Sequence, residues 1–129
     1  MPSVHIATRA GLTTAEKRAL LDAVHEALMI AFKIPDHDRS QRLTEYPADA
    51  FDIPPGRGPR YTVVEIAAFP GRSLDAKRAL DREIASRFAA AGVPAQDLFI
   101  VLSEPPLENW GLRGGQAACD LGYGAPAKS

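Results

Sequence analysis

Pro2 is the first residue whose chemistry could define a catalytic site. It follows the initiator methionine, and a small second residue such as proline normally permits removal of that methionine. The secondary amine exposed in this way has an ordinary pKa of about 7.7–8.0. An apolar pocket or neighbouring arginines lower that pKa, because they disfavour the charged form. A neutral amine near pH 7 is a competent general base, so Pro2 is the candidate catalytic group.

Arg72 and Asp38 are the candidate partners of this amine. Arg72 stands between Gly71 and Ser73 at the start of a predicted helix. A forked guanidinium there suits a carboxylate, and the helix terminus adds positive potential. The alternative for Arg72 is a solvated loop side chain. Asp38 lies in a polar turn before a strand, where its carboxylate could orient a water or a substrate proton, or instead make a local backbone hydrogen bond.

Aromatic and basic side chains could complete such a site. Trp110 is the single tryptophan and precedes a glycine-rich run. That run can fold an aromatic wall over a pocket, although packing in the core or at a subunit interface would equally explain the residue. Arg9 stands near the end of the first predicted strand, at the place that Phe69 takes in an internal repeat.

An internal duplication organises the elements that must position these groups. The segment Lys17-Arg18-Ala19-Leu20 recurs 60 positions later (77 − 17) as Lys77-Arg78-Ala79-Leu80. We therefore predict a single domain over residues 1–129, made of repeat units over about 2–58 and 59–117 and a C-terminal tail over 118–129.

The second half of each unit repeats as well. After one deletion the offset becomes 59 (94 − 35), because Ile34-Pro35 corresponds to Val93-Pro94. The same offset pairs Asp38 with Asp97. It also pairs the segments Thr44-Glu45 and Ser103-Glu104.

Each unit reads strand, helix, strand. The predicted strands cover residues 4–8, 39–45, 61–68 and 98–103. Thr13 with Glu16 has capping-box spacing at the start of the first helix, and Ser73 is the cap of the second. Both helices carry an apolar stripe at i+4 spacing, formed by Leu20, Val24 and Leu28 in the first and by Leu80, Ile84 and Phe88 in the second.

This order predicts an α/β (α+β) fold. Two strands joined by a crossover helix normally lie parallel in one sheet, with a right-handed connection. Duplication of the β-α-β unit then gives a four-stranded sheet with two helices on one face. The other face would be bare and apolar, and it requires a cover. Self-association supplies that cover, so an oligomer is predicted.

Composition excludes several classes of protein. The formal net charge is −1 and the pI is about 6.3. The chain therefore lacks the excess of positive charge that nucleic-acid binders use to contact phosphates. Cys119 is the single cysteine, so an internal disulfide is impossible, and Cys and His show no zinc-ligand spacing. The longest apolar run, residues 98–102, falls far short of a membrane helix, and the N-terminus lacks a signal-peptide pattern. We expect a cytoplasmic protein with neither nucleic acid nor membrane as a partner.

The order and spacing of these motifs resemble one family over most of the chain, roughly Pro2 to Ala117. The Met-Pro start and the Gly-Arg-Ser turn followed by a helical lysine are similar to the long-chain tautomerases related to malonate semialdehyde decarboxylase. The other matching segments are Ile34-Pro35-Asp36-His37-Asp38-Arg39 and Glu108-Asn109-Trp110.

The resemblance implies a cofactor-independent homotrimer with active sites at its subunit interfaces. In such a protein Pro2 is the catalytic amine, acting as a base in keto-enol tautomerases and as a cationic acid in decarboxylases and dehalogenases. Asp38 would activate water or the substrate carbonyl, and Arg72 would bind the carboxylate of a small substrate. Trp110 would lie in the segment that lines the hydrophobic wall.

One departure bears on the reaction. The decarboxylases and dehalogenases carry a second arginine just before the Gly-Arg turn, where this chain has Phe69 and Pro70. Phe69 would then contact the substrate as an apolar group. Arg9 or Arg113 could replace the missing guanidinium by reaching into the site.

Three hypotheses follow. The first is a tautomerase acting on a 2-oxo acid or its enol, with phenylpyruvate-like enols as test substrates. The second is a decarboxylase or hydratase acting on a three-carbon oxo acid such as malonate semialdehyde, with Asp38 activating water. The third is a trimeric binding or signalling module without catalysis, which gains ground if the methionine stays attached and blocks the amine.

Overall fold

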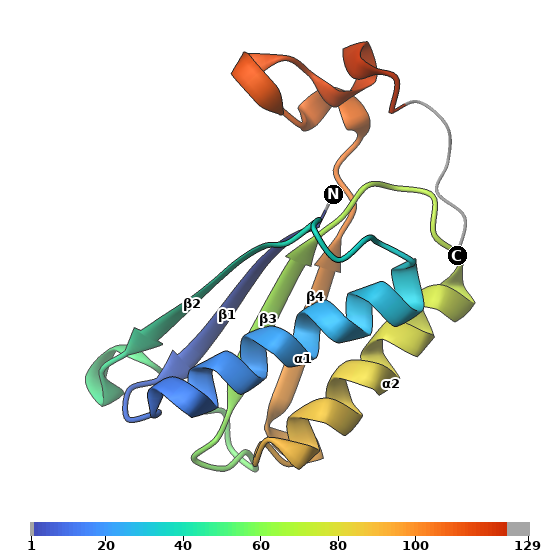
Figure 1. The fold of residues 1–129 in the computed structure, drawn as a ribbon. Coiled ribbons are helices and arrows are strands. Elements are labelled where there is room, and N and C mark those ends of the chain that lie inside the picture. Colours follow the sequence, from blue (N-terminus) through green and yellow to red (C-terminus); the bar gives the residue numbers. More distant parts are fainter. Residues whose placement is uncertain (1, 124–129) are drawn as a thin grey trace.

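The computed structural model describes residues 2–123, so Met1 and residues 124–129 of the predicted tail lie outside it. Four strands and two long helices follow one another as strand, helix, strand in each half of the chain, as the duplication predicts (Figure 1). They are β1 (Ser3–Arg9), α1 (Thr14–Phe32), β2 (Ser40–Tyr46), β3 (Thr62–Ala67), α2 (Leu74–Ala90) and β4 (Leu98–Ser103). The observed strand ends lie within one residue of the predicted ones.

The four strands form one mixed sheet in the order β2-β1-β3-β4. Within each unit the strands are parallel, as β-α-β connections require. The units meet through β1 and β3, which are antiparallel, with Ser3 opposite Ala67. An approximate twofold axis between β1 and β3 therefore relates the units, and equivalent residues lie at opposite ends of the sheet.

The two helices begin at equivalent caps. The Thr13 side chain accepts a hydrogen bond from the Glu16 N–H at 3.1 Å, and the Glu16 carboxylate accepts one from the Thr13 N–H at 2.9 Å, which completes the predicted capping box. Ser73 accepts from the Ala76 N–H at 3.1 Å. Gly11 and Gly71 precede these caps with φ of 122° and 120°, a conformation that favours glycine. The local structure of each unit is thus repeated in detail.

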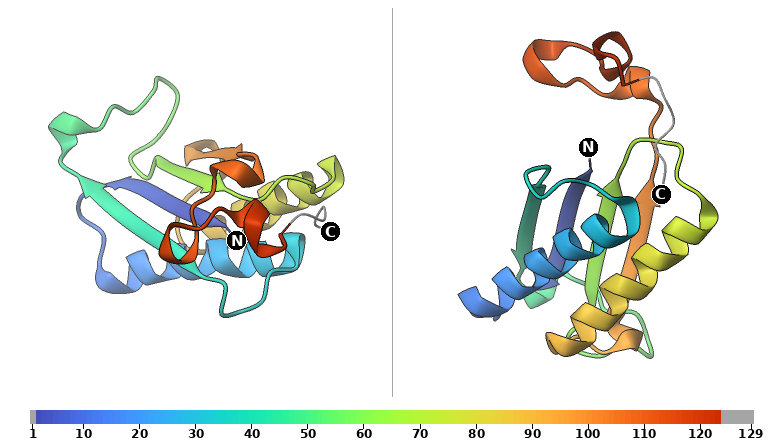
Figure 2. Two further views of the ribbon diagram at one scale, coloured as in Figure 1. Left: turned by 90° about the horizontal axis from the view of Figure 1, so that it is seen from above. Right: turned by 45° about the vertical axis from the view of Figure 1, so that its right-hand side comes forward.

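Both helices cover one face of the sheet, as the two views of Figure 2 show. The predicted stripes of both helices are buried, from Leu20 on α1 to Phe88 on α2. On β4, Ile100 packs against this core, whereas Phe99 and Val101 point to the other face and are 44% and 42% exposed. The predicted fold class is confirmed, including the apolar face that the helices leave uncovered.

The segment after β4 stands above the end of the sheet at which β1 begins (Figures 1 and 2). It contains three short 3-10 helices, η3 (Leu107–Asn109), η4 (Arg113–Gly115) and η5 (Ala118–Leu121). Ala118 is fully buried, and its N–H donates to the Trp110 carbonyl at 2.9 Å. In the described part of the chain, neither α1 nor α2 is long and apolar enough to cross a membrane.

Equivalent ion pairs tie each helix to the closing strand of its unit. Lys17 contacts Glu45 at 2.8 Å, and Lys77 contacts Glu104 at 2.5 Å. Glu45 also accepts hydrogen bonds from the Leu12 and Gly11 N–H groups, at 3.2 and 3.1 Å. The bond from Lys17, followed by that from Leu12, holds the pKa of Glu45 below its ordinary value of 4.5.

Replacing Glu45 with glutamine should flatten the acid dependence of stability. Because the pKa of Glu45 is lower in the folded than in the unfolded chain, its stabilising effect is complete above about pH 4.5 and disappears as the pH falls through the folded value. Thermal melts from pH 7 to pH 3 should show a smaller loss of Tm in Glu45→Gln than in the wild type. Exposed Glu108→Gln is the matched control. Parallel wild-type and Glu45→Gln curves would contradict this linkage.

Candidate active site

The candidate residues gather at the end of the sheet where β1 begins. Pro2 is buried and immediately precedes β1, the strand between β2 and β3. Asp38 lies two residues before β2, whose first residue pairs with Ser3. Phe69 lies two residues after β3, whose last residue also pairs with Ser3. We call Pro2, Asp38, Phe69, Arg72 and Trp110 the Pro2 cluster.

Arg72 is held at this end by the backbone and by an aromatic ring. Its Nη1 and Nη2 atoms donate to the carbonyls of Phe69 and Phe32, each at 3.3 Å. Its guanidinium lies over the Phe32 ring, 4.8 Å from the centroid. Its Nε atom is buried and has no hydrogen-bond partner within residues 2–123. The side chain is therefore oriented and keeps donor capacity for another group.

Two carboxylates act on the guanidinium of Arg72. Burial lowers the pKa of Arg72, while the charges of Glu104 and Asp38 oppose that shift. An arginine remains protonated at neutral pH in spite of such a shift. Asp38 is half-buried, and its N–H donates to the Pro35 carbonyl at 3.0 Å, which forms the predicted turn. The fold thus brings Asp38 close enough for its charge to act on Arg72, although the two residues are far apart in the sequence.

An aromatic wall adjoins these charged groups. The Phe69 and Trp110 rings meet edge to face with centroids 5.0 Å apart, and the Tyr123 centroid lies 5.5 Å from that of Phe69. Trp110 is oriented by a hydrogen bond from Nε1 to the Pro105 carbonyl at 3.0 Å. Tyr123 was missed in the sequence because it belongs to the predicted tail. The signal available in the sequence was that Tyr123 is the single aromatic residue of that tail.

The two arginines considered as replacements for a second guanidinium are placed differently. Arg113 is exposed in η4, within the segment above the Pro2 cluster. Arg9 ends β1, seven residues beyond Pro2, or roughly 23 Å at about 3.3 Å per residue. Within one chain Arg9 therefore does not join the Pro2 cluster, and a contribution to that site would require a neighbouring copy.

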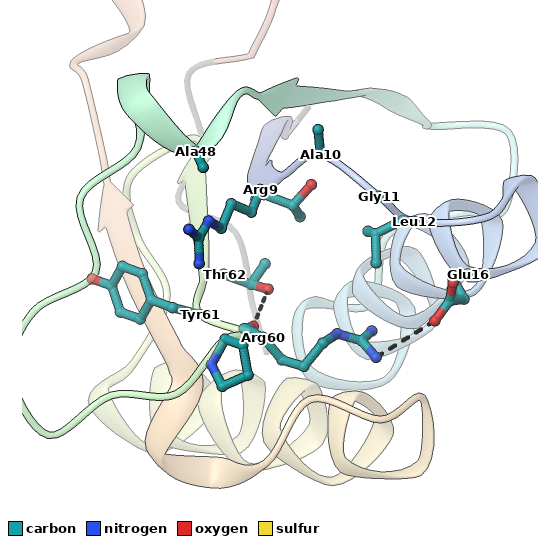
Figure 3. Close-up of a pocket in the computed structure, with 11 residues that line it drawn as sticks. Arg9, Ala10, Gly11, Leu12, Glu16, Ala48, Arg60, Tyr61 and Thr62 are labelled. Carbon is teal, nitrogen blue, oxygen red and sulfur yellow. Dashed lines mark hydrogen bonds and ion pairs between the residues drawn. The ribbon is translucent and has the colours of Figure 1, made fainter.

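Arg9 instead lines a separate pocket of about 460 Å³ at the opposite end of the sheet (Figure 3). We call it the Arg9 pocket, and its lining includes Thr8, Arg9, Leu12, Glu16, Arg60 and Thr62. Sequence reasoning did not find this pocket. The duplication was the signal, because it places Thr62 at the position equivalent to Pro2, 60 residues on (62 − 2).

The Pro2 cluster combines an amine, a guanidinium and a carboxylate beside apolar rings. Such a set can bind a carboxylate and transfer a proton at an adjacent carbon or oxygen. Among the residues that the structure describes, no group of three or more His, Cys, Asp and Glu side chains could hold a metal ion. The groups present are those of acid–base chemistry.

Several known proteins are similar to this chain over most of their length. The chain is 28% identical over 123 residues to the probable tautomerase YusQ of Bacillus subtilis (strain 168), covering 91% of this chain and 97% of that protein. It is 27% identical to FG41 malonate semialdehyde decarboxylase, solved as inhibited by 3-bromopropiolate, with a TM-score of 0.81 over 92% of this chain and 94% of that one.

A third relative was solved as an assembly. The wild-type symmetric trimer of Q0 fused 4-OT is 26% identical, with a TM-score of 0.82 over 92% of this chain and 98% of that one. The model of a family described as "Tautomerase enzyme" matches residues 38–113, which is more than half of the chain. That match begins at Asp38 and includes Phe69, Arg72 and Trp110. The chain therefore belongs to the tautomerase family.

Proposed function

We propose that this protein is a cofactor-independent tautomerase in which the Pro2 amine moves a proton between carbon and oxygen of a small 2-oxo acid or its enol. The observation that carries the proposal is the burial of Pro2 at the end of the sheet that also holds Asp38 and Arg72, where the charge of Asp38 acts on Arg72. Burial and a nearby cation both disfavour a charged amine. A neutral amine near pH 7 can take a proton from the enol and return it to carbon.

The other members of the Pro2 cluster have complementary roles in this proposal. Arg72 binds the substrate carboxylate, since its guanidinium is held in place and its Nε is unpartnered within residues 2–123. Asp38 orients the end of the substrate at which the proton is transferred. Phe69 and Trp110 contact the apolar part of the substrate, and Arg113 is positioned above the cluster to contact a second polar group. Proton transfer by one oriented amine needs no second guanidinium.

The same proposal includes assembly and location. A homotrimer would cover the apolar face that Phe99 and Val101 leave exposed, and the trimeric fused 4-OT relative supports that assembly. A cytoplasmic location agrees with Cys119 being the single cysteine of the chain.

A second candidate function is decarboxylation or hydration of a three-carbon oxo acid. The 27% identity to FG41 malonate semialdehyde decarboxylase favours it, as does the proximity of Asp38 and Arg72. In this reaction Asp38 activates water, and Pro2 acts as a cation. Phe69 and Pro70 stand where the decarboxylases carry a second arginine, so the carbonyl would be polarised less.

The titration of the Pro2 amine distinguishes these reactions. With nitrogen-15 labelled proline, we expect the amine to titrate well below the ordinary 7.7–8.0 of a free terminus. Phenylpyruvate enol should then ketonise faster with the protein than without it. A raised pKa with acetaldehyde formed from malonate semialdehyde would replace the first function by the second. If the methionine is retained and blocks the amine, and neither substrate is turned over, the result would favour the non-catalytic binding module.

A further inference from the structure

The Arg9 pocket is the twofold equivalent of the Pro2 cluster. At an offset of 60, Thr62 corresponds to Pro2 and Thr13 to Ser73. The β1–β3 ladder reaches Ala7 opposite Val63, so Thr8 and Thr62 follow at its far end. The duplication has thus built the same framework at both ends of the sheet, and only one end carries the chain terminus.

The groups that would carry chemistry are replaced in the Arg9 pocket. Thr62 is 2% exposed, and its hydroxyl donates to the Arg60 carbonyl at 2.8 Å. Asp97, the counterpart of Asp38, is 1% exposed and accepts from the Gly58 and Arg60 N–H groups at 2.5 and 3.2 Å. Both side chains therefore form hydrogen bonds with the backbone of the loop before β3. The Arg9 pocket therefore has neither an amine base nor an accessible aspartate in the equivalent places.

A guanidinium is retained at a different position. Arg9 takes the place of Phe69, and Leu12 takes that of Arg72. At this pair of equivalent positions each end of the sheet therefore has one arginine and one apolar side chain, in exchanged order. Within residues 2–123, the Arg9 side chain has no hydrogen bond or ion pair, and Figure 3 shows its guanidinium extending between Ala48 and Thr62. A forked donor in a pocket is suited to a carboxylate.

Two residues that line the Arg9 pocket each have a buried polar side-chain atom without a hydrogen-bond partner within residues 2–123. Thr8 is 3% exposed, and its Oγ1 atom is buried and unpartnered within residues 2–123. The Nη2 atom of Arg60 is likewise buried without a partner in those residues, while its Nη1 reaches Glu16 at 3.5 Å. Buried polar side chains are almost always hydrogen-bonded. Both residues line the Arg9 pocket, so a ligand bound there is an available partner for them.

Charge and size narrow the class of ligand. Arg9 and Arg60 are opposed by one carboxylate, Glu16, which already accepts from the Thr13 N–H at 2.9 Å. The lining thus has one net positive charge, which matches a monoanion better than a phosphate ester carrying about −1.5 to −2. The volume of about 460 Å³ falls within the range of small-molecule sites. We propose that the Arg9 pocket binds a small organic monocarboxylate without transforming it.

Benzoate binding to an Arg72→Gln protein tests this proposal. That variant removes the guanidinium of the Pro2 cluster and leaves the Arg9 pocket intact, so binding is measured independently of turnover. Calorimetry should detect benzoate, and the neutral isostere benzamide should bind at least about tenfold more weakly. The amide resonances of Ala10 and Tyr61 should shift on benzoate addition, whereas that of Ser73 should not.

Adding Arg9→Gln to the same protein should weaken benzoate binding by at least about tenfold, and Arg9→Lys should restore part of it. Thr8→Val, an isosteric change, is a second variant expected to weaken binding if Arg9→Gln fails to fold. Unchanged affinity in folded Arg9→Gln, equal binding of benzamide, or shifts confined to Ser73 would overturn the proposal. Tighter binding of inorganic phosphate than of benzoate would overturn the monocarboxylate assignment.

Discussion

Replacing Pro2 with alanine should lower kcat/KM for enol tautomerisation by about 100-fold or more. Alanine still permits removal of the methionine, so the chain keeps a terminal amine. That amine is no longer fixed by the pyrrolidine ring, and it can rotate away from the substrate. A misplacement of about 1 Å can itself cost about 100-fold in rate.

Stopped-flow or spectrophotometric assays of phenylpyruvate ketonisation would measure this loss. Pro55→Ala is the matched control, because Pro55 is exposed in the loop between β2 and β3. It should retain the wild-type rate. The melting temperature and oligomeric state of Pro2→Ala must match those of the wild type. A folded variant with an undiminished rate would show that the amine is not the base.

Replacing Arg72 with glutamine should raise KM by about 10- to 100-fold, because hydrogen bonds to charged groups contribute about 1.5–3 kcal/mol. If the carboxylate is held equally in the ground and transition states, kcat changes little. Arg72→Lys should recover only part of the affinity, since lysine keeps the charge and loses the fork.

A substrate without a carboxylate separates binding from structure. With a methyl ester of the 2-oxo acid, the wild type and Arg72→Gln should have similar kcat/KM values, because the guanidinium has no anion to hold. Measuring kcat/KM for the acid and the ester with both proteins completes a thermodynamic cycle. The cycle gives the coupling energy between the Arg72 side chain and the substrate carboxylate. An equal loss with both substrates would mean that Arg72 acts through its contacts with the Phe32 ring and carbonyl.

The sequence predicted the elements because their signals are local. The Thr13–Glu16 capping box consists of hydrogen bonds between residues three apart in the sequence. The apolar stripes are buried because of a spacing that can be read along each helix. The duplication showed that the elements predicted for the first unit should recur in the second. The turn that positions Arg72 followed from the same reasoning, since Gly71 with φ of 120° repeats Gly11.

The placement of Arg9 could not be predicted in the same way. The repeat correctly relates Arg9 to Phe69, but it does not say how the two units join. The antiparallel contact of β1 with β3 sends equivalent positions to opposite ends of the sheet. Arg9 therefore lies far from the place of its counterpart within one chain. The action of the Asp38 charge on Arg72 and the tilted contact of the Tyr123 and Phe69 rings are likewise long-range results of the fold.

The burial of Pro2 has a practical consequence for anyone who produces this protein. In the proposed function Pro2 acts through a free amine, and a purification tag fused ahead of it would turn that amine into an amide, which accepts no proton at neutral pH. The extra chain would also have to leave from a buried position at the start of β1. Recombinant protein meant for kinetic work should therefore carry its tag at the other terminus, or release it by a protease that cuts immediately before proline.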